Sequence, residues 1–116
     1  MYFCQNINIE TMMVIQLLST NESQIHEIAD YLLLEGLIGN AMLTGPIDVK
    51  TCLDGSTIKQ SKQCKLQGIS KSLLFSKINK RLKDKYGERM PLLYSEPIIL
   101  IDPQQTDAII ERLVRV

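Results

Sequence analysis

The chain has 116 residues, 45% hydrophobic and 22% charged, which is the composition of an ordinary globular domain with a single core. Thirteen basic residues balance thirteen acidic ones, so no overall field attracts nucleic acid or a membrane surface, and no apolar run approaches the ~20 residues of a membrane span. Three cysteines without a CxxC pair indicate reduced thiols, and we expect a cytoplasmic protein with neither a nucleic-acid nor a membrane partner.

The first strand is predicted at the start of a single domain that we place at residues 11–116. Thr11 to Ser19 is apolar on both faces apart from Gln16, which is typical of a central strand covered on at least one side. Residues 1–10 have weak periodicity and fit either a lead-in segment or an added edge strand.

Helical periodicity predicts the first helix, from about Glu22 to Glu35. Apolar residues recur at intervals of three and four, and they predict a buried stripe that consists of Ile25, Ile28, Ala29, Leu32 and Leu33. Gly36 then supplies the left-handed cap that ends the helix.

Two extended segments, between about Ile38 and Ile69, meet at Asp54-Gly55. Asp-Gly between alternating apolar residues predicts a hairpin, because Gly adopts a positive φ without a steric penalty. Each arm spans roughly a dozen residues, about twice the length of a usual strand. Arms of this length extend beyond the sheet of a small domain, and their free edges must be paired, covered or charged. We therefore interpret the hairpin as an assembly device, with Val49, Leu53 and Leu66 as interface residues.

The second helix follows, with Ser70 or Ser72 as its N-cap. Leu74, Ile78 and Leu82 are spaced by four residues and define its apolar stripe, and Gly87 ends it.

The last strand is predicted from Leu92 to Ile101. Pro97 lies inside it and indicates an edge position or a bulge, because proline donates no ladder hydrogen bond. Asp102-Pro103 then starts a short terminal helix, with Asp as the N-cap and Pro at the first helical position.

The order of elements is thus β-α-β-β-α-β-α. Two βαβ-like halves with an antiparallel sheet and both main helices on one face predict an α+β fold, the ferredoxin-like sandwich, with a long hairpin between the second and third strands and an additional C-terminal helix.

Candidate metal ligands are few in this sequence. Cys52 and Cys64 lie on the two hairpin arms, where they serve either as thiolate ligands for soft Cu(I) or as buried or interface cysteines. A tight turn at Asp54-Gly55 leaves these two thiols too far apart to share one ion within a chain. His26 is the only histidine and lies about 100° off the buried stripe of the first helix, so we expect it at the surface.

The candidate ligand cleft is a set of four polar residues. Tyr94 and Glu96 share one side of the last strand by alternation, and Lys50 and Arg89 are the basic residues that can line an intersubunit cleft with them. No GxGxxG or Walker pattern and no nucleophile with a base is present, so we expect a binding module and not an enzyme.

From about Met13 to Leu113 the pattern resembles the CutA-type divalent-cation tolerance proteins, which are related in fold to the PII signalling proteins. The matching segments follow the family's helix ends, hairpin tip and proline spacing: Ala29 to Leu37, Cys52 to Ile58, Leu74-Phe75, Lys80 to Leu82, Met90-Pro91 and Pro97-Ile98. The chain departs from the family where its tip Trp is Leu53, where the Glu after the first proline is Leu92, and where its acidic segment is Lys59 to Gln63.

The resemblance implies a homotrimer in which long hairpins of neighbouring subunits join edge to edge. It also implies a role in metal-ion tolerance or signalling, with copper or another divalent metal as the bound ion. Two alternatives remain: a PII-like regulator that docks a protein partner through a flexible loop at Lys59 to Lys65, and a structural trimer that has lost the family's site.

Overall fold

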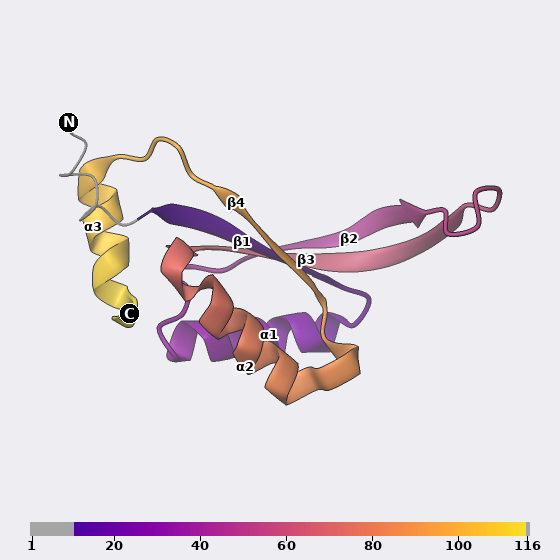
Figure 1. The fold of residues 1–116 in the computed structure, drawn as a ribbon, viewed down its shortest axis with the longest axis horizontal. Coiled ribbons are helices and arrows are strands. Elements are labelled where there is room, and N and C mark those ends of the chain that lie inside the picture. Colours follow the sequence, from indigo (N-terminus) through magenta and orange to yellow (C-terminus); the bar gives the residue numbers. More distant parts are fainter. Residues whose placement is uncertain (1–10, 116) are drawn as a thin grey trace.

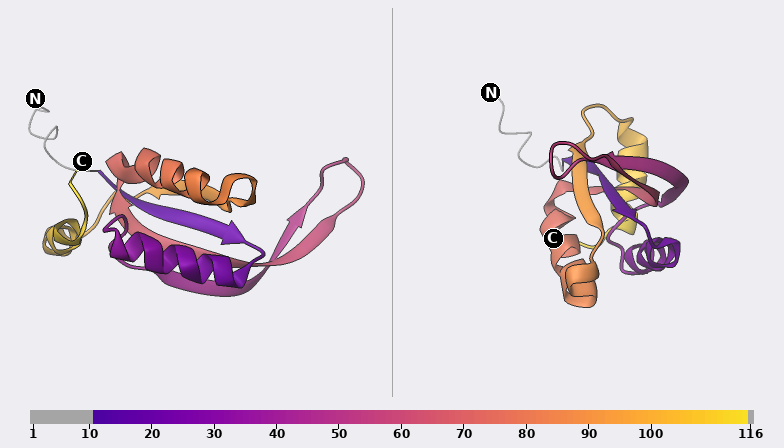
Figure 2. Two further views of the ribbon diagram at one scale, coloured as in Figure 1. Left: turned by 90° about the horizontal axis from the view of Figure 1, so that it is seen from below. Right: turned by 90° about the vertical axis from the view of Figure 1, so that its right-hand side faces the viewer.

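The computed structural model describes residues 11–115 and shows a four-stranded antiparallel sheet with the two main helices packed on one face (Figures 1 and 2). The strands lie in the order β2-β3-β1-β4. The elements are β1 (Met12–Ser19), α1 (Glu22–Leu34), β2 (Met42–Thr51), β3 (Lys59–Lys71), α2 (Phe75–Tyr86), β4 (Leu92–Pro97) and α3 (Pro103–Arg112). This order and topology confirm the predicted ferredoxin-like α+β fold with a long hairpin and a C-terminal helix.

The core lies between the sheet and the two main helices. Alternate residues of β1 point to this face because side chains alternate along a strand, and they meet the apolar stripes of α1 and α2. The fully buried side chains of this layer include Ile15, Leu17, Ile25, Ile28, Leu32, Leu66, Ile78 and Leu82. Leu33, which was predicted within the stripe, is 41% exposed, since it lies at the margin of that stripe.

The helix ends follow the capping chemistry of the sequence in most places. The Asn21 side chain accepts a hydrogen bond from the Gln24 N–H at the start of α1, and Asp102 accepts one from the Gln105 N–H at the start of α3. Gly36 and Gly87 have φ values of 67° and 58°, as expected of glycines that end helices.

The predicted serine cap of α2 is wrong. A 3₁₀ turn, Ser72–Leu74, leads into the helix, and no side chain caps its first turn. The Ser70 hydroxyl is instead buried and donates a 2.6 Å hydrogen bond to the Leu37 carbonyl.

The β2–β3 hairpin extends beyond the rest of the sheet, at the right of Figure 1. Residues 64–71 of β3 pair with β1, whereas residues 59–63 pair only with residues 47–51 of β2. These five pairs form a ribbon of about 17 Å at about 3.3 Å per residue. The radius of gyration is accordingly 16.1 Å, longer than the ~13 Å expected of a compact chain of this length.

Several details of the hairpin differ from the prediction. Its tip is a loop, residues 52–58, in which Gly55 has φ 80°. Lys59 to Lys65 is part of β3 and not a flexible loop, because its polar side chains lie on an exposed ribbon where apolar alternation is not required. A register shift between Thr44 and Ile47 marks a bulge or irregularity at Pro46, a residue that donates no ladder hydrogen bond.

β4 ends at Pro97 and lies at one edge of the sheet, as that proline predicts. The strand is shorter than predicted, because residues 98–101 turn away toward α3, which lies at the end of the molecule opposite the hairpin tip (Figure 1). The alternatives for residues 1–10 fall outside the described residues. Within residues 11–115, no helix is long and apolar enough to cross a membrane.

Candidate functional site: the open sheet face and the hairpin

The sheet face away from α1 and α2, here called the open face, is built from three rows of directly opposed residues. Paired residues of antiparallel strands point to the same side, so the register defines the rows. They are Met42–Gln67–Gln16–Tyr94, Thr44–Lys65–Leu18–Leu92 and Ile69–Val14–Glu96. Along the hairpin, Ile47 and Val49 continue this side of the ribbon, opposite Gln63 and Ser61.

A polar network lies at the centre of the open face. Gln16 is only 2% exposed. Its Oε1 accepts a hydrogen bond from the Tyr94 hydroxyl at 3.3 Å, and its Nε2 donates to the Glu96 carboxylate. The buried amide is thereby satisfied, and Tyr94 and Glu96 share one side of β4, as alternation predicted.

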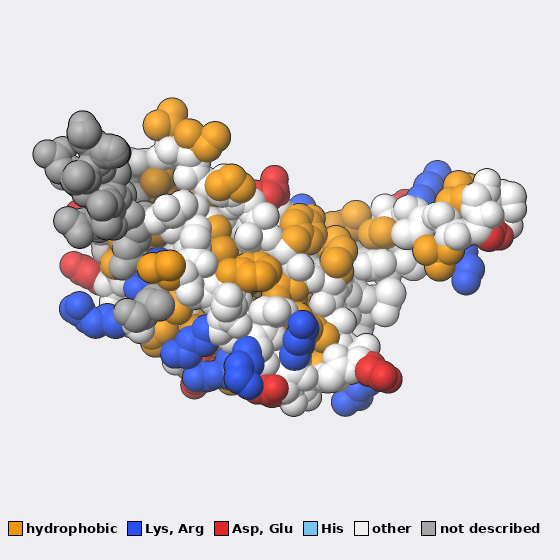
Figure 3. Space-filling model, in the orientation of Figure 1, with side chains coloured by type: hydrophobic (Ala, Val, Ile, Leu, Met, Phe, Trp, Pro, Cys, Tyr) orange, Lys and Arg blue, Asp and Glu red, His pale blue; other side chains and the backbone are white. Residues whose placement is uncertain are grey.

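Apolar side chains surround this network and remain exposed. Met42, Leu92 and Tyr94 are 51%, 61% and 37% exposed, respectively, while Val14, Leu18 and Ile69 are half-buried. Figure 3 shows hydrophobic side chains over the region where β4 crosses the base of the hairpin, and Lys and Arg gathered along the lower edge over α2. Contiguous exposed apolar surface of this kind marks an interaction site more often than a solvated face.

The four predicted cleft residues are not all brought together by one chain. Tyr94 and Glu96 meet at Gln16 on the open face. Lys50 lies opposite Gln60 on the overhanging ribbon, and Arg89 lies at the end of a short turn, Gly87–Arg89, that follows α2. Gln16 was not among the predicted site residues, although its position as the one polar residue between Met12 and Leu18 was a signal for it.

The hairpin tip is held by Asp54. Its carboxylate accepts hydrogen bonds from the backbone N–H groups of Ser56, at 2.9 Å, and Thr57, at 2.7 Å. These bonds favour the charged form and lower the pKa of Asp54 to about 2. Leu53 and Ile58 are 85% and 63% exposed beside it, so the tip presents apolar side chains on a hydrogen-bonded turn.

The ribbon between tip and sheet carries an ion pair between Lys62 and Asp48. The hydrogen bond from Lys62 lowers the pKa of the Asp48 carboxyl. Both side chains are largely exposed, so the pair contributes little to stability.

The two candidate thiolate ligands remain apart within one chain. Cys52 is exposed in the tip loop, and Cys64 is half-buried on β3 opposite Ser19. Among the residues that the structure describes, no group of three His, Cys, Asp or Glu side chains is close enough to hold a metal ion. His26 is exposed, as predicted.

The predicted interface residues differ in their exposure. Leu53 at the tip is exposed, and Val49 on the ribbon is half-buried. Leu66 is fully buried against the helices of its own chain. It is therefore part of the core of its own chain.

Comparison with known proteins finds no family model and no curated protein that matches this sequence. Solved structures do match. CutA1 from Oryza sativa is 11% identical with a TM-score of 0.82, covering 92% of this chain and 97% of its own. The divalent cation tolerance protein from Thermus thermophilus is 17% identical with a TM-score of 0.79, covering 89% and 99%. The periplasmic divalent cation tolerance protein CutA from Archaeoglobus fulgidus is 17% identical with a TM-score of 0.76, covering 87% and 97%.

These matches cover 87–92% of this chain and at least 97% of each solved chain. At such low identity, likeness of structure establishes the fold. The chain therefore has the fold of the CutA divalent-cation tolerance proteins.

Proposed function

We propose that this protein is a cytoplasmic homotrimer of the CutA type that binds a divalent cation or a small ligand, and that it acts as a tolerance or signalling module and not as an enzyme. Support comes from the shared fold, since the solved proteins of this fold are described as divalent cation tolerance proteins.

The proposal rests above all on the uncovered surface formed by the open face and the hairpin. A ribbon of two strands is at best marginally stable alone in water, yet five residue pairs of this hairpin have no other strand beside them among the described residues. The open face adds exposed Met42 and Leu92. A second and a third copy would cover both surfaces.

The ligand site in this proposal lies between subunits. The polar network of Gln16, Tyr94 and Glu96 is exposed to a neighbouring chain through its carboxylate and hydroxyl. A hairpin from that neighbour can bring Lys50 and Cys52 to the network, which a single chain cannot do. Such a cleft offers carboxylate and thiolate ligands, which suit copper or zinc.

Titration calorimetry of the reduced protein tests this site, with zinc, copper and ATP as separate ligands. We expect saturable heat for at least one of them, and a reduced affinity in Glu96→Gln. Glu88→Gln is the matched control, because Glu88 is an exposed carboxylate on the turn after α2. Absence of heat with all three ligands would leave a structural trimer and refute ligand binding.

A PII-like regulator that docks a protein partner is the second candidate. This role is favoured by the exposed side chains at the start of β3, from Lys59. The segment is a strand, whereas the PII-like alternative predicted a flexible loop there. Capture of a specific transporter or metabolic enzyme by the trimer, lost when Lys59 and Lys62 are replaced by Glu, would support this role over ligand binding.

A further inference from the structure

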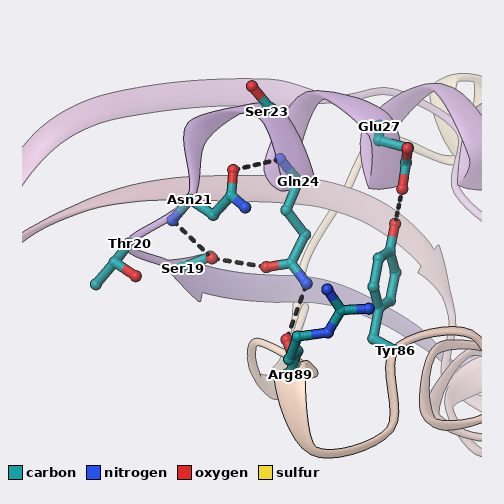
Figure 4. A pocket seen from close by; sticks show the side chains of 8 residues that line it. All are labelled: Ser19, Thr20, Asn21, Ser23, Gln24, Glu27, Tyr86 and Arg89. Carbon is teal, nitrogen blue, oxygen red and sulfur yellow. Dashed lines mark hydrogen bonds between the residues drawn. The ribbon is translucent and has the colours of Figure 1, made fainter.

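A second candidate site lies on the helix side of the molecule, away from the open face and within one chain. It is a pocket of about 540 Å³ between the start of α1 and the turn after α2 (Figure 4). Pockets that bind small molecules have volumes of about 300–1,000 Å³. Its walls are polar, since they consist of hydroxyl, amide and charged side chains together with the Tyr86 ring.

The backbone of Arg89 is fixed at this pocket by a relay of hydrogen bonds. The Ser19 hydroxyl, which is 9% exposed, donates to the Gln24 Oε1 at 2.7 Å, and the Gln24 Nε2 donates to the Arg89 carbonyl at 2.8 Å. The turn after α2 is therefore tied to α1. The side chain of Arg89 takes no part in this relay.

The Arg89 guanidinium has no hydrogen-bond or ion-pair partner among residues 11–115, in contrast to two other arginines. Arg81 binds Tyr31 and Glu35, and Arg112 donates to the Gly39 carbonyl. In Figure 4 the Arg89 side chain reaches from the turn toward α1, beside the Tyr86 ring. The guanidinium has five N–H donors in a fork that matches the two oxygens of a carboxylate or phosphate.

The acidic residue of the pocket, Glu27, is already engaged. Its carboxylate accepts a hydrogen bond from the Tyr86 hydroxyl and lies 3.7 Å from the Lys85 ammonium. These two partners lower the pKa of Glu27, so it is charged at neutral pH. With Glu27 balanced by Lys85, the positive charge of Arg89 is not compensated within the pocket.

We propose that this pocket binds the oxyanion group, a phosphate or a carboxylate, of a small polar molecule. Arg89 is the principal ligand of the oxyanion. The Asn21 amide N–H groups are further donors, and Thr20 and Ser23 also line the pocket with their hydroxyl groups. The pocket is larger than an isolated phosphate, so its ligand extends beyond the oxyanion. The residues that line this pocket all belong to one chain.

The test is a titration of ¹⁵N-labelled protein with inorganic phosphate and, separately, with acetate, at constant ionic strength. We expect saturable amide shifts confined to residues 19–24 and 86–89. Tighter binding of phosphate identifies a phosphorylated ligand, and tighter binding of acetate identifies a carboxylated one. Shifts spread over the exposed lysines without saturation would overturn the proposal.

Variants separate the side chain of Arg89 from the fold. Arg89→Gln should weaken phosphate binding about ten- to hundredfold, the usual effect of losing hydrogen bonds to a charged group. It should leave the melting temperature unchanged, since the relay uses the Arg89 carbonyl. Lys83→Gln is the control, because it removes the same charge from an exposed position of α2 outside the pocket. Equal affinity of Arg89→Gln and wild type would contradict the assignment.

Discussion

The residue that best shows how a buried polar group is placed in this core is Ser70. It is fully buried at the end of β3, where its hydroxyl donates to the Leu37 carbonyl in the segment between α1 and β2. The Asn40 side chain accepts a hydrogen bond from the Ile69 N–H at 2.9 Å in the same region. These bonds connect the sheet to the segment that leads into the hairpin.

We therefore expect Ser70→Ala to destabilise the fold by about 1–3 kcal/mol, because the buried Leu37 carbonyl would lose its partner. Urea denaturation measures this change. Ser76→Ala is the control, since Ser76 is exposed on α2 and should change the free energy of unfolding by no more than about 0.5 kcal/mol. Equal stability of the two variants would show that the Ser70 hydrogen bond contributes nothing net.

At the scale of single residues, the sequence predicted a residue's role correctly where that role depends on its neighbours in the chain. The Asp102 cap and the left-handed Gly36 were correct, because each depends on neighbours within a few residues. Ser70 was wrongly predicted to cap a helix, since its actual partner lies thirty-three residues away. Gln16 was recognised as an exception in an apolar strand, but its partners on β4 become visible only when β1 and β4 pair.

Among the structural elements, the hairpin tip gives a prediction about pH. The backbone N–H groups of Ser56 and Thr57 lower the pKa of Asp54 from 3.8 to about 2. A lowered pKa in the folded state means that this group stabilises the tip above pH ~4, and that the contribution is lost as pH falls toward 2.

An NMR titration should therefore show amide shifts of Ser56 and Thr57 with a midpoint near pH 2, as the carboxylate that accepts their hydrogen bonds loses its charge. In Asp54→Asn these shifts should be absent, because the side chain no longer titrates. A midpoint near pH 4 in the wild-type protein would mean that the carboxylate does not hold the turn.

The elements themselves were largely predictable, and the exceptions have physical reasons. For α1, α2 and β1, the apolar pattern predicted the correct type of element and its approximate ends, because each of these elements buries one continuous surface. The Asp54-Gly55 signal correctly predicted that the polar run from Lys59 lies on a hairpin arm, and only the PII-like alternative, which made this run a loop, was wrong.

At the scale of the whole molecule, the exposed hairpin tip leads us to a prediction about trimer assembly. Leu53→Asp should weaken the trimer, because a carboxylate would replace an apolar side chain at the proposed contact and lose hydration there. Sedimentation velocity at matched concentrations measures the loss of the trimer. Leu73→Asp is the control, since Leu73 is 66% exposed and precedes α2, where an acidic residue is tolerated. An unchanged sedimentation coefficient for Leu53→Asp would remove the tip from the interface.

The candidate site was less predictable than the fold because, in the proposed trimer, it lies between chains. Tyr94 and Glu96 were placed together correctly by alternation, but Lys50 and Arg89 lie on separate parts of the chain. A site shared between subunits depends on symmetry, which one sequence does not specify. Apolar burial on the open face would drive association at about 25 cal/mol per Å², and the entropic cost of association offsets part of it.

Light scattering on the reduced protein is the decisive test of the proposed trimer. We predict a mass near three times the 13.2 kDa of the chain, constant over a range of protein concentrations. A mass of 13.2 kDa throughout that range would contradict the trimer, because the open face and the hairpin would then remain exposed to water in solution.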